Sequence, residues 1–132
     1  MAAIPQKVLD LLNDPATVKV LVTASKGGRP HAIVAGTIAA PSPETMVIGE
    51  VLMKRASANL QANPKAAFLI SKGTESYEIN VRAKVRLTSG PELDGMNKVL
   101  AGMNLHAGAM WVFDVCCVCD EGAHPGAGTK IA

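Results

Sequence analysis

The chain has 132 residues, of which 48% are hydrophobic and 18% charged, and its formal net charge is +2 at pH 7. This length fits one domain, and this balance excludes an extensively disordered chain. The basic residues are spread along the sequence, which argues against a nucleic-acid-binding surface. No apolar run reaches the roughly 20 residues that a membrane-spanning helix needs, and the N-terminus lacks a secretory signal pattern. We therefore expect one soluble, cytoplasmic domain over residues 1–132, whose apolar surplus is buried in a homodimer.

The first half of the sequence predicts one short helix and three strands. Pro5 opens a helix with one apolar face, which ends before Pro15. β-branched residues predict a strand over 18–23 and a second strand over 31–40, joined by a glycine turn. A third strand is expected over 45–52, after a proline-rich break.

The second half predicts two helices and three more strands. Lys54–Asn63 favours a helix that Pro64 ends. Glu75–Leu87 alternates apolar and polar residues throughout, as a strand with one buried face does. The other elements are a strand over 66–71, a helix opening at Gly90 and Pro91, a strand over 111–119, and a loose Gly-rich tail over 122–132. The sum is a mainly β fold, a six-stranded antiparallel barrel with short flanking helices.

Two adjacent cations, Lys54 and Arg55, stand where the third strand gives way to a helix. A guanidinium, an ammonium and the unpaired amide groups of a first helical turn can converge on one phosphate. Taken alone, such a pair is more often solvated surface.

The residues around this pair resemble the signature of pyridoxamine 5'-phosphate oxidase-like flavoproteins. That signature joins two basic residues and an alanine to a leucine, an Asn-Pro pair and two more alanines, here Lys54, Arg55, Ala56, Leu60, Asn63, Pro64, Ala66 and Ala67. Residues 90–92 are also similar to the small FMN-binding members, and the resemblance spans about residues 16–105. It implies a split barrel that binds FMN in a homodimer, with each flavin site between the subunits.

The resemblance also implies roles for individual residues. In that family the paired basic residues bind the FMN phosphate, which assigns this role to Lys54 and Arg55. The flavin ring lies along two neighbouring strands, whose positions here are Ile33, Val34, Ala35, Gly36, Ile48 and Gly49. Glu78 stands where the oxidases carry a Gln that touches the cofactor, so this residue departs from the family pattern. The alternative for all these strand residues is packing in the barrel core.

Other chemistry-bearing residues give weaker signals. His31, His106 and His124 have no partner at a recognisable spacing, so the sequence identifies no catalytic dyad. Cys116, Cys117 and Cys119 cannot all point the same way on one strand, and no second pair completes a four-ligand metal site. We expect these thiols to be small buried residues of a core strand, and we predict no metal site.

These observations favour an FMN-binding redox flavoprotein, either an electron carrier or a small flavin-dependent oxidoreductase. A flavin supplies the redox chemistry itself, so the lack of a catalytic constellation counts little against this function. The alternative is a non-enzymatic split-barrel module that binds another phosphorylated ligand. A thiol-based metal protein ranks third.

Overall fold

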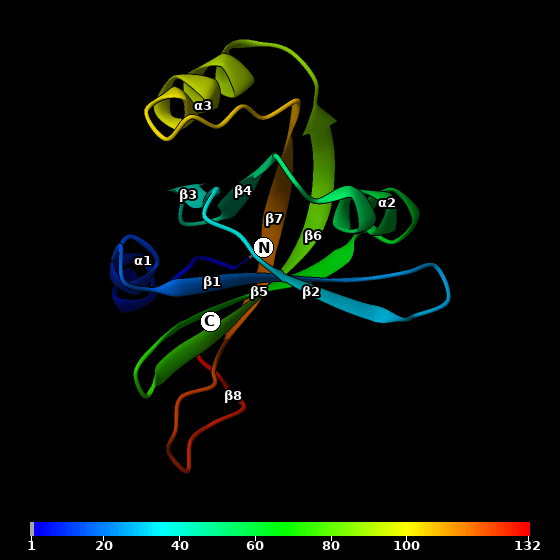
Figure 1. Cartoon of the computed structure of the whole chain (residues 1–132). Coiled ribbons are helices and arrows are strands. Elements are labelled where there is room, and N and C mark those ends of the chain that lie inside the picture. Colours follow the sequence, from blue (N-terminus) through cyan, green and yellow to red (C-terminus); the bar gives the residue numbers. More distant parts are fainter. Residues whose placement is uncertain (1) are drawn as a thin grey trace.

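The computed structural model describes residues 2–132 as one curved antiparallel sheet with three short helices around it (Figure 1). The strands are β1 (Val18–Ala24), β2 (Pro30–Val34), β3 (Ile38–Ser42), β4 (Thr45–Glu50), β5 (Lys65–Lys72), β6 (Glu75–Leu87), β7 (Ala109–Asp120) and β8 (Thr129–Lys130). The helices are α1 (Gln6–Leu12), α2 (Lys54–Ala62) and α3 (Pro91–Ala101). The strands are ordered β2-β1-β5-β6-β7-β4-β3, and β8 pairs with β7. None of the described helices is long and apolar enough to cross a membrane.

The expected fold class is confirmed, since the molecule is a mainly β, antiparallel split barrel with short helices. It has eight strands where the sequence predicts six. The strand predicted over 31–40 is two strands, because the chain leaves β1 after Val34 and pairs with β4 from Ile38 onward. The other additional strand, β8, comes from the C-terminal segment.

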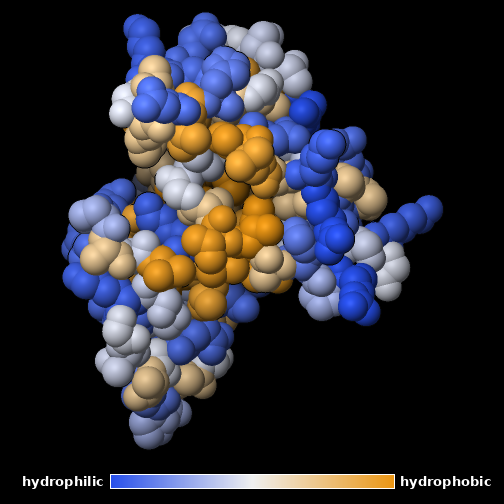
Figure 2. All heavy atoms as spheres, in the orientation of Figure 1, coloured by the Kyte–Doolittle hydropathy of each residue, from blue (hydrophilic) through white to orange (hydrophobic). Residues whose placement is uncertain are grey.

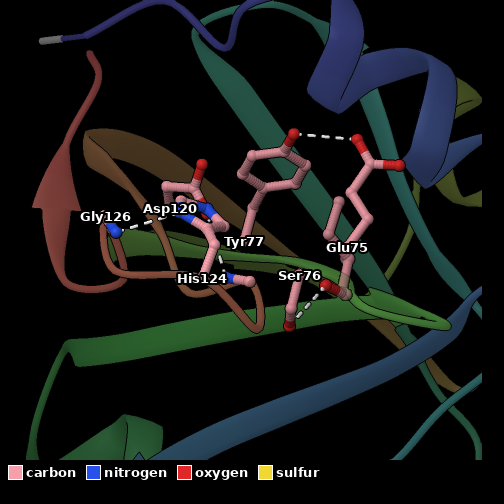
Figure 3. A network of polar contacts seen from close by, with 8 residues as sticks. Glu75, Ser76, Tyr77, Asp120, His124 and Gly126 are labelled. Carbon is pink, nitrogen blue, oxygen red and sulfur yellow. Dashed lines mark hydrogen bonds and ion pairs between the residues drawn. The ribbon is translucent and has the colours of Figure 1, made fainter.

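The C-terminal segment, which the sequence predicts to be loose from Gly122 onward, folds back along β7. The Val118 amide donates a hydrogen bond to the Ala132 carbonyl at 3.0 Å. Figure 3 shows how side chains hold the intervening turn, where His124 Nε2 lies 2.9 Å from a carboxylate oxygen of Asp120. Composition does not reveal this pairing, because a Gly-rich backbone is ordered wherever its polar groups find partners.

The main core lies inside the curve of the sheet and centres on two aromatic rings. Phe68 of β5 and Phe113 of β7 meet edge to face, with ring centroids 5.1 Å apart. Such a pair is worth about 0.5–1.5 kcal/mol beyond the area that it buries. The other large side chains with no more than 1% exposure are Val8, Leu12, Leu21, Met46, Ile48, Ile70, Ile79, Val115 and Val118.

The second half of β6 departs from the predicted alternation. The sequence pattern places Val85 and Leu87 on the core face of this strand. A bulge at Lys84 inserts one extra residue, which changes the face of every residue that follows. Val85 therefore lies opposite Val112 on the outer face of the sheet. Leu87 follows it there and packs against a second apolar cluster, to which α3 contributes.

Candidate cofactor site

The first turn of α2 leaves its backbone N–H groups without a side-chain cap. Met53 holds the N-cap position, and no acidic residue lies in the first turn. Lys54 and Arg55 open the helix and are both exposed. The first turn of α3 also lacks a side-chain cap, but it contains Glu92 and Asp94. The N-terminal end of a helix carries partial positive charge. In α2 two cations add to this charge and make the end suited to an anion, whereas in α3 two carboxylates offset it.

Polar side chains fix α2 against the sheet, so that its N-terminal end is held in place. Asn59 Nδ2 donates to Thr23 Oγ1 on β1 at 3.1 Å, and both residues are buried. Asn63 Nδ2 donates to the Ser25 carbonyl at 3.4 Å. Leu60 packs in the main core beneath the helix. Leu60 and Asn63 of the signature therefore dock the helix and need no ligand to explain them.

A hollow of about 200 Å³ lies where β2 passes into β3 and faces β4. Its walls are backbone and small or apolar side chains, which suit a planar aromatic ring. Six of the nine residues predicted for the site line this hollow: Ile33, Val34, Ala35, Gly36, Ile48 and Gly49.

A second hollow of about 400 Å³ adjoins the first at the start of α2. Val51, Leu52 and Met53 line both hollows, and Glu50 and Lys54 complete the second. The two hollows therefore lie next to each other, and the second one reaches the cationic end of α2.

An acidic residue also lies at this end of the site. Glu50 accepts a hydrogen bond from Arg86 Nε at 2.8 Å in a partly exposed ion pair. Partial burial alone would raise the pKa of Glu50, but the hydrogen bonds from Arg86 and Ser57 hold that pKa below its ordinary value. Because Arg86 neutralises this carboxylate, the charge of Lys54 is left to face a ligand.

Two predicted residues lie outside both hollows. Arg55 is exposed beside Lys54 in the first turn of α2 but lines neither hollow. Glu78 lies on β6 opposite Cys119 of β7, and Asn80 donates to its carboxylate at 2.8 Å. The single chain thus brings Lys54 together with the strand residues and leaves Glu78 apart from them.

The two predicted glycines differ in their surroundings. A Cβ atom on Gly49 would lie 2.7 Å from Met96 Sδ and 3.3 Å from the Ala107 Cβ. A Cβ atom on Gly36 would meet nothing within 4 Å. Gly49 therefore permits the close approach of α3 to β4, whereas Gly36 leaves open space beside the hollow.

Sequence reasoning missed some of the lining residues. Leu52 is 93% exposed, and its position two residues before the cation pair is the signal that could have identified it. Leu105 reaches the hollow from a loop that Asn97 holds through bonds to the Ala107 carbonyl and amide, at 3.0 and 2.8 Å. No local pattern reports such a contact between distant segments. The missed residues are Thr37, Glu50, Val51, Leu52, Met53 and Leu105.

A separate hollow of about 580 Å³ lies between α3 and the strands β4, β6 and β7. None of the predicted site residues lines it. Figure 2 shows apolar side chains gathered below α3, over β3, β4 and β7. The apolar lining residues are Val47, Val85, Leu87, Met96, Met110 and Val112.

The model of the pyridoxamine 5'-phosphate oxidase family matches residues 4–113, which include α2 and both hollows. The chain belongs to this family. The resemblance seen around Lys54 and Arg55 is thereby confirmed. As a member of the pyridoxamine 5'-phosphate oxidase family, the chain has a flavin-binding fold. A comparison with curated protein sequences gives no match.

Several solved structures share the fold at low sequence identity. HupZ of Group A Streptococcus gives a TM-score of 0.82 at 18% identity, over 95% of this chain and 99% of that chain. An FMN-binding protein from Syntrophomonas wolfei gives a TM-score of 0.76 at 16% identity, over 90% of this chain and 84% of that one. HutZ, the heme storage protein of Vibrio cholerae, gives a TM-score of 0.59 at 14% identity, over 86% of this chain and 89% of that chain. At these identities the likeness concerns the fold alone.

Proposed function

We propose that this protein binds FMN and acts as a redox flavoprotein, either an electron carrier or a small flavin-dependent oxidoreductase. One observation carries the proposal: the uncapped end of α2, with Lys54 and Arg55 in its first turn, adjoins an apolar hollow. A flavin mononucleotide has the matching chemistry, since a phosphate and an aromatic ring system lie at its two ends. When bound, FMN supplies hydride or single-electron transfer, which the protein side chains cannot supply.

The residues of this chain would bind and orient the cofactor. Lys54 and Arg55, with the first amide groups of α2, would hold the phosphate. The backbone of residues 33–36 and of Ile48 and Gly49 would lie against the ring. Asn59 and Asn63 would keep the phosphate end at a fixed distance from the ring end, because they dock α2 onto β1 and the turn that follows it.

The proposal includes a homodimer in which the second copy completes the site. At about 200 Å³, the apolar hollow is smaller than the roughly 300–1,000 Å³ of typical cofactor pockets. Apolar side chains around it remain exposed: Val34 is 74% exposed, Leu52 is 93% exposed and Leu105 is 39% exposed. A second copy seated over these side chains would bury them and enclose the other face of the ring.

The alternative is a non-enzymatic module that binds another phosphorylated ligand. The position of Glu78 favours it, because this residue lies away from the hollows that the other predicted residues line. The lining itself favours it too, since Thr37 is the one polar side chain in the apolar hollow and its hydroxyl donates to the Gly49 carbonyl at 3.0 Å. Few side chains would then read the polar edge of a flavin.

The test is a pair of titrations with FMN and with riboflavin, which lacks the phosphate, followed by flavin fluorescence. We expect the wild-type protein to bind FMN more tightly than riboflavin. Arg55→Ala and Lys54→Ala should each weaken FMN binding by about 1.5–3 kcal/mol, or roughly 10- to 150-fold, because each removes a charge-assisted phosphate contact. Neither variant should change riboflavin binding.

Lys26→Ala is the control, because it removes one exposed cation from the β1–β2 turn and keeps the two cations of α2. We expect this variant to bind FMN as the wild type does. Equal affinity of the wild type for FMN and riboflavin, or an unchanged FMN affinity in both α2 variants, contradicts the phosphate assignment. Binding of a phosphorylated ligand other than FMN, with no uptake of FMN, supports the alternative.

A further inference from the structure

Two of the three cysteines lie side by side on the outer face of β7. Cys117 pairs with Asn80 of β6, and Cys119 pairs with Glu78. Val118 between them is fully buried, which places the two thiols together on the opposite face. Both cysteines are half-buried and free. The expectation that the three thiols are buried core residues is therefore wrong, because only the alternate residues of this strand face the core.

A bulge separates the third cysteine from this pair. Asn80 pairs with Cys117 while its neighbour Val81 pairs with Val115, which leaves Cys116 without a partner in the ladder. Cys116 is exposed, and its sulfur lies 3.9 Å from the Asp114 carbonyl of its own strand. The chain therefore offers a thiol pair and one separate thiol of the same chemistry.

The surroundings of the pair favour a bound cation over free thiolates. Glu78 of β6 pairs with Cys119, so a carboxylate stands beside this thiol. Lys130 of β8 lies opposite Cys119 on the other side of the strand. A bound metal ion would offset the repulsion between two thiolates, and Lys130 would offset the remaining negative charge.

The spacing of the pair suits a bridging ion better than a disulfide. Residues i and i+2 of a strand are separated by roughly 6.7 Å between Cα atoms, which is at the upper limit of the range that disulfides span. A metal ion between the two sulfurs lengthens the bridge, so the two residues can be joined without a shift of the backbone.

We propose that Cys117 and Cys119 form a two-thiolate site for a soft monovalent metal ion, with Cu(I) as the best fit. Thiolates select soft ions of this kind. Structural zinc needs four ligands, and residues 2–132 contain no group of three or more His, Cys, Asp and Glu side chains placed to hold an ion. Binding forms two Cu–S bonds and releases one proton from each thiol, with no change in the oxidation state of sulfur or copper.

The experiment is an anaerobic competition for Cu(I) between the fully reduced protein and the chelator bathocuproine disulfonate. We expect the wild type to take one Cu(I) per chain. Cys117→Ser and Cys119→Ser should each lower the affinity by more than about 100-fold, since loss of a ligand exceeds the ten- to hundredfold effect of outer-shell partners. Cys116→Ser is the matched control and should retain the wild-type affinity. X-ray absorption of the loaded protein should show copper with two sulfur neighbours.

Thermal melts of the metal-free variants separate loss of the site from loss of the fold, and Cys117→Ala provides a second variant at the same position. A wild type that yields all its copper to the chelator overturns the proposal. An equal loss of affinity in Cys116→Ser does so too, as does a stoichiometry of one ion for two chains. Because no residue of the proposed flavin site is used, failure of this test leaves the FMN titrations unaffected.

Discussion

The signature residues over 54–67 fall into two groups that the structure separates. Leu60 and Asn63 attach α2 to the sheet through core packing and a hydrogen bond to the Ser25 carbonyl, and Asn59, which lies outside the signature, adds a second hydrogen bond. Lys54 and Arg55 remain exposed at the end of the helix that these contacts hold in place. Both groups were visible in the sequence, but their different roles follow only from the partners that each side chain meets.

Gly49→Ala tests the close approach of α3 to β4. The added methyl group would lie 2.7 Å from Met96 Sδ and 3.3 Å from Ala107 Cβ, so the flexible Met96 side chain must move and Ala107 must yield. We expect a loss of about 1–3 kcal/mol in the free energy of unfolding, as is usual for an overpacked site. Urea denaturation measures this loss.

The matched control for that variant is Gly36→Ala, at a glycine of the same hollow. A Cβ atom there meets nothing within 4 Å, so we expect a change within about 0.5 kcal/mol. Equal unfolding midpoints for the two variants would show that the contact between α3 and Gly49 leaves room for a methyl group.

Acidification tests the ion pair at the phosphate end of the site. The pKa of Glu50 is lower in the folded protein than its ordinary value of 4.5, so Glu50 stabilises the fold above that pH and this contribution is lost as the pH falls through the folded pKa. We expect Glu50→Gln to be less stable than the wild type at pH 7 and the difference to shrink towards pH 3. Thermal unfolding from pH 7 to pH 3 measures it, and a difference that is constant with pH would contradict the lowered pKa.

At the scale of elements, most helices and strands could be predicted from the sequence because their signals are local. Pro64 ends α2 near the predicted residue, and the apolar alternation identifies the first half of β6. The bulge at Lys84 could not be predicted, because it depends on pairing with β7. The division of 31–40 into β2 and β3 likewise depends on which neighbouring strand each half meets.

Asn97→Ala tests the attachment of α3 to the loop that carries Leu105. Asn97 bonds to both the amide and the carbonyl of Ala107, and removing it leaves both groups without this partner. We expect a loss of about 1–3 kcal/mol in stability and faster amide hydrogen exchange over residues 102–108. Since Leu105 lines the apolar hollow, FMN affinity should fall as well.

Asn13→Ala is the control, because Asn13 is an exposed asparagine at the C-terminal end of α1. It should leave both the exchange of residues 102–108 and the FMN affinity unchanged. Unchanged exchange in Asn97→Ala would show that packing alone holds the loop.

At the scale of the whole molecule, part of the candidate site could be predicted and part could not. Lys54 and the residues of 33–36 and 48–49 were predicted because the resemblance covers them, and they line two hollows that share three residues. Leu105 was missed because its contact with the site spans most of the chain. Glu78 lines neither hollow of its own chain.

The proposed dimer can be tested on the exposed side of α3. Val99 is 69% exposed and Met103 is 53% exposed, and both line a hollow beside Gly36. If the second copy covers this face, Val99→Glu should convert the dimer to a monomer and weaken FMN binding, because a buried charge without a partner is costly. Light scattering after size-exclusion chromatography measures the mass.

Val18→Glu is the control for the dimer face. Val18 is 51% exposed and opens β1, away from both hollows of the proposed flavin site. We expect this variant to remain a dimer. A monomer for Val18→Glu and a dimer for Val99→Glu would place the interface on the other side of the sheet.

The measurement that tests the central claim most directly is a visible absorption spectrum of the purified protein, with any released chromophore identified by mass. We predict flavin bands and the release of FMN, or the appearance of both after FMN is added to colourless protein. A heme spectrum, or a colourless protein that takes up no added FMN, would contradict the claim.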